Sequence, residues 1–584
     1  MENSEDIDQE NGMKESLLDK HPSKHQVGGL RTLPFILANE GFERAAFYGL
    51  EPNMIVYLMG NYGLKMTTGS NIIFLWSAAT NFTPILGAFL ADSYVGRFWM
   101  IALGSIFSFM GMMLLWSTTI IPGARPFTTA TNTTTSPTPF QLILLFSSLG
   151  LMSIGTGGIR SSTLAFGADQ LTHNEDENAK PSCVGVLESF FNWYYFSVSF
   201  AVLFALTCVV YIQDHAGWRV GFGVPVLLML LSTISFFSAS SFYVNVKPPK
   251  ASLLTQFAQV IVASWRNRHY DFSSQLNMDR VYHVVKGSTL EFPSEKLRFL
   301  NKACIVKDPT QDVTPDGVAV DPWHLCTIDQ VEDFKSIINI IPLWSTGIML
   351  GVNANTSSFR VLQAISMDRH LFTQNFEIPP GSFGTFALIT LMLWLVLYDR
   401  IIIPLASKVM GKPVRLNVKT RMGIGLLLSF ICLVVAGVVE SVRREMATRG
   451  DHDGASSMVR MSALWLVPQV CLFGLAEAFT AIAQIEFFYS EFPRSMSSMA
   501  SNLYGLGAGV ASLVASVIMS GVDHVTTKFG ESWVSSDINK GHYDYYYWIL
   551  AGLSLLNYVY FVFCSKGYDQ GKRALRDTKV ISNA

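Results

Sequence analysis

The sequence predicts an all-α membrane protein that crosses the bilayer twelve times, as two bundles of six transmembrane helices. Three observations support this fold class. Half of the 584 residues are hydrophobic and only 15% are charged, whereas soluble domains average about 25% charged residues. Apolar segments long enough to span a bilayer recur twelve times. The longest polar interior segment, 244–329, separates six of these from the other six, as in proteins built from two repeated bundles.

Each bundle is predicted from its run of apolar segments. In the first half, the expected spans are 33–60, 70–91, 98–121, 139–163, 184–212 and 219–243. In the second half, they are 332–353, 380–405, 421–441, 461–489, 496–520 and 545–564. The predicted domains are therefore an N-terminal tail 1–30, a bundle 31–243, a linker 244–329, a bundle 330–565 and a C-terminal tail 566–584.

The distribution of basic residues predicts the orientation. The linker carries ten lysines and arginines, and the C-terminal tail and the loop after the eighth span are also basic. Cytoplasmic segments are enriched in lysine and arginine, so we expect the linker and both termini in the cytosol. One predicted outer loop, 442–460, conflicts with this rule because it holds four arginines.

The first span contains three charged residues close together, Glu40, Glu43 and Arg44. A charged side chain at the bilayer centre costs about 2.5–3.5 kcal/mol on insertion scales, so three together need a reason. Their spacing places them on one helical face, where Arg44 can neutralise Glu40. Such a cluster typically faces an aqueous pathway and carries protons. The alternative is an ion pair that only packs the bundle. Glu51, two turns further on, is expected near the interface.

Two further charges lie well inside apolar spans, Arg160 in the fourth and Glu477 in the tenth. Because they belong to opposite halves, we expect them to meet across a central cavity, pairing when one mouth closes and separating when it opens. An opposite charge within about 4–6 Å favours both ionised forms. The alternatives are a permanent lock between the bundles, or an arginine that extends to the membrane interface.

A short charged turn follows the second span. Asp92, Gly96 and Arg97 combine a carboxylate, a flexible glycine and a cation, which can latch neighbouring helices at the inner face. On its own, the same pattern also suits an ordinary charged turn.

Composition and motifs argue against several classes of protein. The net charge of −2 gives no indication of a nucleic-acid partner. The seven cysteines form no CxxC pair, so neither a zinc site nor a disulfide framework is indicated. No phosphate-binding loop or intramembrane Ser/His/Asp set is present, which argues against an enzyme.

Several motifs together resemble a known family, the plant nitrate transporter/peptide transporter family within the proton-coupled oligopeptide transporters of the major facilitator superfamily. The resemblance covers about 30–565. The matching segments are Glu40-Gly-Phe-Glu43-Arg44, Asp92 to Arg97, Gly155-Thr-Gly-Gly-Ile-Arg160, Phe166 to Gln170, Phe190 to Tyr195, Ile378 to Phe383, Tyr398 to Arg400 and Glu491 to Arg494.

The resemblance implies symport of a small solute with protons, without another cofactor. It assigns proton coupling to Glu40, Glu43 and Arg44. It also implies that Arg160 and Glu477, with Arg44, line the substrate cavity. The expected partners are a small anionic solute, protons and the lipid bilayer, and the sequence leaves the oligomeric state open.

Two positions depart from the nitrate-transporting pattern. That pattern includes a histidine in span seven, whereas Gly347 to Asn355 contains none and Asn353 is nearest to its place. Asparagine can donate hydrogen bonds to an anion but cannot titrate near neutral pH. Met100 stands where the pattern can have a phosphorylatable threonine. High nitrate affinity and a phosphorylation switch at that site are therefore not expected.

The leading functional hypothesis is low-affinity, proton-coupled nitrate uptake across a plant plasma membrane. Transport of a hormone or another small organic acid, or of di- and tripeptides, is the alternative within transporters. A peptide would place its amino end at Glu477 and its carboxylate at Arg160. A nutrient receptor without transport is the alternative from another class.

Overall fold

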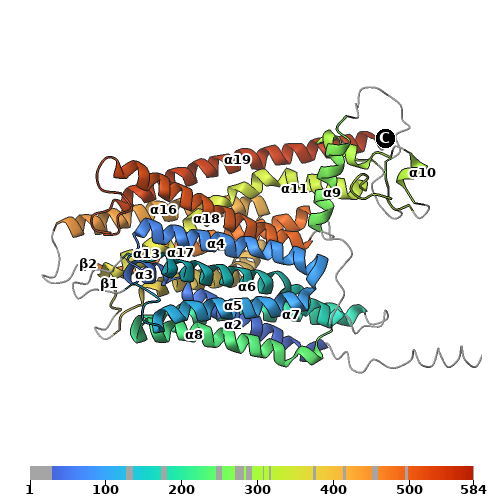
Figure 1. Cartoon of the computed structure of the whole chain (residues 1–584). Coiled ribbons are helices and arrows are strands. Elements are labelled where there is room, and N and C mark those ends of the chain that lie inside the picture. Colours follow the sequence, from blue (N-terminus) through green and yellow to red (C-terminus); the bar gives the residue numbers. More distant parts are fainter. Residues whose placement is uncertain are drawn as a thin grey trace, which may run out of the picture.

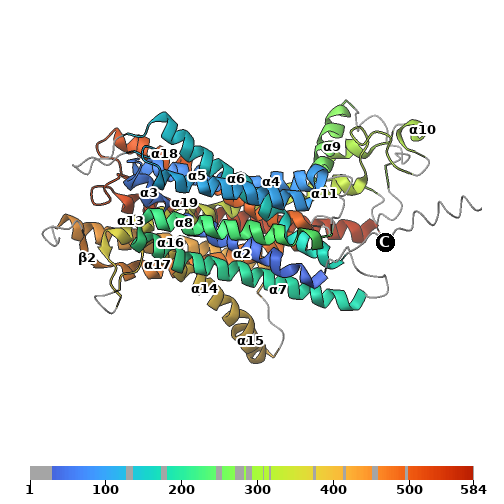
Figure 2. The same cartoon turned by 60° about the horizontal axis from the view of Figure 1, so that its bottom comes forward.

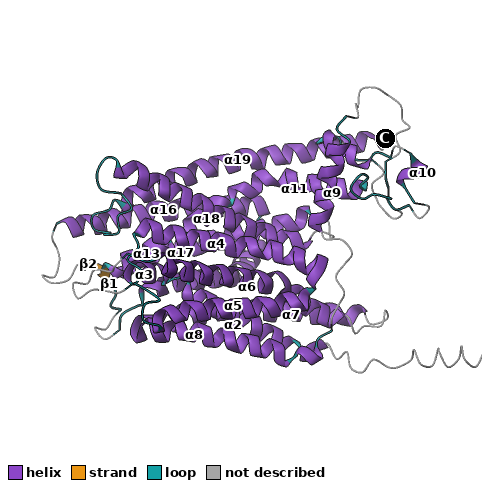
Figure 3. Ribbon diagram, viewed as in Figure 1, coloured by secondary structure: helices purple, strands orange, loops and turns teal. Residues whose placement is uncertain are grey.

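The computed structural model describes residues 29–582 except for short gaps at 127–135, 173–179, 245–252, 270–281, 285–291, 307, 315–316, 372–375, 412–415, 450–457 and 493–496. Most of the predicted N-terminal tail thus lies outside the described residues. Long helices run side by side along one common direction (Figure 1). Helix accounts for nearly all of the regular structure, with two short strands at one end (Figure 3). The all-helical prediction is confirmed.

The first half of the chain forms six membrane-length segments. They are α2 (Leu33–Leu50) continued by α3 (Met54–Gly60), α4 (Met66–Leu90), α5 (Arg97–Ile120), α6 (Pro139–Thr172), α7 (Lys180–Phe204) and α8 (Val210–Ser238). The apolar helical stretch Ser189–Phe242 has 54 residues, about 80 Å at 1.5 Å per residue, which exceeds twice the thickness of a bilayer core. Gly217, with φ of 76°, breaks it into the two predicted spans.

The second half also forms six segments. They are α11 (Ile328–Thr346) with α12 (Ile348–Ala354) and α13 (Ser357–Ile365), α14 (Gly384–Leu397) with α15 (Ile403–Met410), α16 (Val418–Thr448), α17 (Val467–Glu491), α18 (Ser497–Thr527) and α19 (Tyr543–Ser582). The α11–α13 segment bends by 40° and extends beyond the predicted end at residue 353. In the view of Figure 2, α15 leans away from the remaining helices.

The number of spans follows from length and composition. Nine helices in the described part of the chain are long and apolar enough to cross a membrane, and the bent pair is a tenth. Dividing Ser189–Phe242 at Gly217 adds an eleventh. The twelfth is α2–α3, which is less apolar than the other eleven because Glu40, Glu43 and Arg44 lie in it. The structure therefore agrees with the predicted twelve.

Glycines allow α6 to approach its neighbours closely. A Cβ atom on Gly155 would lie 2.3 Å from the Ser108 backbone nitrogen of α5, and one on Gly158 would lie 2.7 Å from the Met100 carbonyl oxygen. Small residues at such contacts let membrane helices pack backbone to backbone. The glycines thus bring α6 into close contact with α5.

The linker packs at one end of the helices, which we call the linker end. It contains α9 (Leu253–Arg266) and α10 (Pro309–Asp312) (Figure 1). Val260 of α9 and Cys304 are buried against Val331 of α11, so part of the linker is fixed to the second half. At the opposite end, which we call the far end, β1 (Met367–Asp368) pairs in parallel with β2 (Val459–Ser462).

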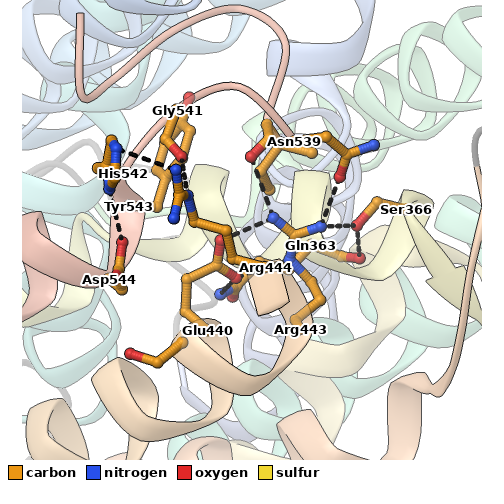
Figure 4. A network of polar contacts seen from close by, with 12 residues as sticks. Gln363, Ser366, Glu440, Arg443, Arg444, Asn539, Gly541, His542, Tyr543 and Asp544 are labelled. Carbon is orange, nitrogen blue, oxygen red and sulfur yellow. Dashed lines mark hydrogen bonds and ion pairs between the residues drawn. The ribbon is translucent and has the colours of Figure 1, made fainter. Parts of the chain in front are cut away.

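The beginning of the predicted loop 442–460 is helical, because α16 continues to Thr448. Arg443 and Glu440 are both fully buried, with Nη2 and Oε1 2.7 Å apart. Gln363 of α13 donates to Glu440, and Arg443 donates to Asn539 in the loop before α19 (Figure 4). This arginine therefore joins three elements at the far end. That structural role explains why it departs from the basic-residue rule.

Candidate functional site

Glu40 lies on α2 and is almost completely buried, with 1% of its surface exposed. Its Oε1 accepts hydrogen bonds from Arg44 Nε at 2.8 Å and from the Tyr194 hydroxyl of α7 at 3.0 Å. Its Oε2 is also buried, and no described residue donates a hydrogen bond to it. A buried carboxylate oxygen without a donor is unfavourable, and no contact among the described residues offsets that cost.

Glu43 lies one turn along the same helix face and uses both carboxylate oxygens. Its Oε1 accepts from Thr156 and from Arg160 Nη2, each at 3.2 Å, and its Oε2 accepts from Arg160 Nε at 3.4 Å. Arg44 Nε lies 3.8 Å from Oε2. Glu43 thus joins α2 to α6 and stands between two arginines.

The four charged side chains form one neutral set, which we call the charge quartet: Glu40, Glu43, Arg44 and Arg160. The predicted shared face of α2 is confirmed, and the 18% and 13% exposure of the two arginines shows that both are largely buried. Opposite charges in contact stabilise each other's ionised forms. A proton added to either glutamate would give the quartet a net positive charge.

The structure does not bring Arg160 and Glu477 into an ion pair. Arg160 binds Glu43 within its own half, and its guanidinium lies over the rings of Phe47 and Tyr48 at 4.6 and 5.7 Å from their centroids. Among the described residues, Glu477 of α17 has neither an ion-pair nor a hydrogen-bond partner. The predicted pairing across the cavity is therefore absent from this conformation and stays a prediction for another one.

Two adjoining cavities lie between the halves. The larger, of about 240 Å³, is lined by Glu477, Gln484, Trp344 and Tyr504 of the second half and by Tyr48 and Asn81 of the first, among others. The smaller, of about 200 Å³, is lined by Glu51, Arg360, Pro380 and Phe383, among others. Tyr48 and Ala354 line both, so the cavities meet there.

The cavity walls match the expected residues only in part. Glu477 lines the larger cavity as expected, whereas Arg44 and Arg160 are turned toward the glutamates of the quartet. Asn353 is 1% exposed and donates to the Ser429 hydroxyl at 3.0 Å, so its amide is engaged inside the second half. Sequence reasoning missed Arg360 altogether and placed Glu51 near the interface.

The predicted latch connects three helices of the first half. Arg97 begins α5 and binds both oxygens of Asp169 on α6 at 2.8 and 2.7 Å. It also lies 3.3 Å from Asp92 Oδ1 in the π-helical turn after α4. Gly96 between them has φ of 83°, a conformation that favours glycine. The sequence identified the turn but not Asp169, which supplies the bidentate contact.

One ion pair and one hydrogen bond join the two halves at the far end. Arg369, which follows β1, lies 3.6 Å from Asp214 of α8 and 2.9 Å from Glu377. The Ser382 hydroxyl donates to the Leu206 carbonyl across the same boundary at 2.7 Å. These contacts hold the far ends of the halves together beside the smaller cavity, which Leu206 also lines.

The chain is similar to a known protein family and to named plant proteins. The model of the POT family, PTR2, matches residues 98–534. The protein NRT1/PTR family 1.2 of Arabidopsis thaliana is 51% identical over 559 residues, which cover 94% of this chain and 91% of that protein. NRT1/PTR family 1.1 of the same plant is 50% identical over 572 residues, covering 97% and 96%.

A solved structure shares the fold. The POT family transporter PepTSo superposes with a TM-score of 0.67 at 19% sequence identity, covering 92% of this chain and 98% of that one. At this identity the likeness concerns the fold alone. It agrees with the predicted major facilitator fold of twelve transmembrane helices in two six-helix bundles.

Proposed function

The chain belongs to the POT family and is a multi-pass membrane transporter, and we propose that it is a proton-coupled symporter of a small anion. The leading substrate is nitrate, taken up with low affinity across the plasma membrane. The linker and both termini lie in the cytosol, which makes the far end the outer face. The basic linker, loop and tail support this orientation.

The observation that carries the proposal is the buried Oε2 atom of Glu40. It lies in a neutral quartet at the centre of a membrane helix and has no donor among the described residues. A proton bound there removes the unfavourable exposure of a bare oxygen to a low-dielectric surrounding. Glu43, whose oxygens both have donors, is less suited to take the proton.

Protonation of Glu40 has a direct consequence for Arg44. The 2.8 Å ion pair becomes a hydrogen bond from the charged guanidinium to a neutral carboxyl, so the attraction between two opposite charges is lost. Arg44 is then freer to change partners. A ligand or proton shifts a conformational equilibrium only by its different affinities for the two states, and the Glu40–Arg44 contact supplies such a difference.

A larger organic acid is the second candidate substrate. The cavity beside Glu477 measures about 240 Å³, whereas one water molecule occupies about 30 Å³ in the liquid. This space exceeds what nitrate requires. Glu477, which has no partner among the described residues, would accept a hydrogen bond from an amino, hydroxyl or amide group of such a solute.

Uptake by oocytes expressing the chain tests the proposal. Currents and tracer uptake are recorded at acidic and neutral external pH with nitrate, a plant-hormone carboxylate and a dipeptide in parallel. We expect acid-stimulated nitrate uptake with inward current. Uptake of a hormone or peptide but not nitrate would replace the leading substrate. No accumulation of any solute would favour a receptor and reject symport.

A further inference from the structure

Arg360 differs from the other two arginines that lie at the centre of the protein. Arg44 and Arg160 each contact a glutamate, whereas no carboxylate among the described residues lies within 4 Å of the Arg360 guanidinium. Its Nη1 donates to the Thr356 hydroxyl at 2.8 Å, and its Cζ lies 5.6 Å from the Phe473 ring centroid. A hydroxyl and a ring face leave the positive charge without a counterion in direct contact.

The surroundings of Arg360 suit a small oxyanion. Arg360 lines the smaller cavity, whose other walls include the apolar side chains of Leu206, Pro380 and Phe383. Water-poor surroundings strengthen the attraction between opposite charges. A guanidinium also presents paired N–H groups that match two oxygens of a carboxylate or a nitrate. Tyr48 lines both cavities, so the smaller cavity adjoins the larger one.

Glu51 lines the same cavity from the first half of the chain. No described residue lies within hydrogen-bond or ion-pair distance of its carboxylate. The charged and titratable groups that face it are Arg160, which acts on it electrostatically, Arg360 across the cavity, and the Tyr48 hydroxyl. An anion held by Arg360 would repel an ionised Glu51 but would accept a hydrogen bond from a protonated one.

We propose that Arg360 and Glu51 form a joint binding site for one oxyanion and one proton. Arg360 binds two oxygens of the anion, and the protonated Glu51 carboxyl donates to another. The empty site holds one positive and one negative charge, and the loaded site holds one positive charge and the bound anion, so its net charge stays zero. This inference rests on the proposed transport of an anion.

The consequence for specificity is a preference for small oxyanions over neutral solutes. Removal of Arg360 should weaken anion binding specifically, since hydrogen bonds to a charged group correspond to a change of about 10- to 100-fold in an equilibrium constant. Removal of the acid at Glu51 should instead change how binding depends on pH.

The test is nitrate uptake by the full-length chain carrying R360Q, R360K, E51Q or the control R219Q. Arg219 lies on α8 with an exposed side chain, so R219Q removes the same charge away from the cavities. We measure KM and maximal rate at acidic and neutral pH. KM does not depend on how much transporter reaches the membrane.

We expect R360Q to raise the KM for nitrate about 10- to 100-fold, R360K to give a smaller increase, and R219Q to match the wild type. E51Q, which keeps a donor but cannot titrate, should retain the acidic KM at neutral pH. An unchanged KM in R360Q overturns the inference, as does an E51Q protein with the pH dependence of the wild type.

Two outcomes separate the proposals. If the wild type takes up no anion at any pH, the proposed function fails. If the wild type transports nitrate and R360Q has the KM of R219Q, only the joint site fails. Should R360Q not reach the membrane, R360K decides the matter, because it keeps the charge and loses the paired N–H groups.

Discussion

Replacing Glu40 by glutamine should weaken the coupling of transport to the proton gradient, because only the proton at Glu51 remains, while leaving exchange of solute intact. Glutamine keeps an oxygen that can accept from Arg44 and Tyr194, which now lie 2.8 and 3.0 Å from Oε1. It removes the negative charge and the atom that would bind the proton. The variant therefore imitates a permanently protonated Glu40.

The magnitude follows from the contact with Arg44. Arg44 stays ionised in the variant, so its hydrogen bond to the glutamine oxygen still contributes about 1.5–3 kcal/mol, whereas breaking a buried ion pair costs about 3–5 kcal/mol. Their difference, roughly 1.5–2 kcal/mol, corresponds to a shift of about 10- to 30-fold between the two arrangements of the bundles. Exchange rates should thus change by no more than about 30-fold, whereas accumulation driven by a pH gradient should fall.

The assay uses purified protein in liposomes. Nitrate tracer uptake is measured with an inwardly directed pH gradient and, in the same preparation, as counterflow without a gradient. Undiminished gradient-driven accumulation by E40Q would refute the assignment of the proton to Glu40. Loss of both gradient-driven uptake and counterflow would show that Glu40 serves binding or folding instead.

E43Q is the matched comparison, because Glu43 lies one turn away and is equally buried. It contacts Arg160, Arg44 and Thr156, so its neutralisation leaves the buried Arg160 without a carboxylate in contact among the described residues, whereas E40Q leaves Glu43 between both arginines. Breaking a buried ion pair typically costs about 3–5 kcal/mol. We expect E43Q to lower the unfolding temperature in detergent more than E40Q does.

Three further predictions concern groups outside the transport pathway. R443Q should lower the free energy of unfolding by about 3–5 kcal/mol, because it leaves Glu440 buried without its cation; thermal unfolding measures this loss. Burial and the adjacent Arg444 lower the pKa of His542, so the folded protein resists its protonation. Stability from this source is complete above the unfolded pKa of about 6.5 and is lost as the pH falls below it, and H542Q should flatten that part of the stability profile. Burial raises the pKa of the Cys304 thiol to about 12, so it should not react with a maleimide at neutral pH in the folded protein.

Matched variants provide the controls. Arg449 also pairs with a glutamate on α16 but is exposed, so R449Q should leave stability nearly unchanged; an equal loss in both variants would argue against the burial effect. His524 is exposed at the end of α18, and H524Q should retain the acid sensitivity of the wild type. Cys304 should react once the protein is unfolded in denaturant, and labelling of Cys304 in the folded protein would contradict the role of burial.

Much of the architecture was predictable because it depends on length and hydropathy. Both quantities locate membrane helices without knowledge of their partners. The exceptions have local causes. The predicted end of the seventh span at residue 353 was too early, since the helix bends near Gly347 and continues to Ile365. The predicted loop start at 442 was wrong because Arg443 is neutralised by Glu440 inside the protein.

For the site, the sequence could predict only contacts between residues on the same helix. The i,i+4 pair of Glu40 and Arg44 follows directly from helical geometry. The choice of Arg160 between Glu43 and Glu477 depends on how separate helices pack, which one sequence does not disclose. Arg360 lay beyond the expected span, although the apolar residues around it, such as Phe359 and Val361, could have signalled that the helix continues.

The neutrality of the charge quartet bears on how voltage acts on the transporter. Glu40 and Glu43 balance Arg44 and Arg160, so moving this set through the membrane field involves no net electrical work. With a proton on Glu40 the set carries one charge, and 100 mV then contributes about 2.3 kcal/mol. An inside-negative potential would thus drive the protonated set inward and leave the return of the deprotonated set insensitive to voltage.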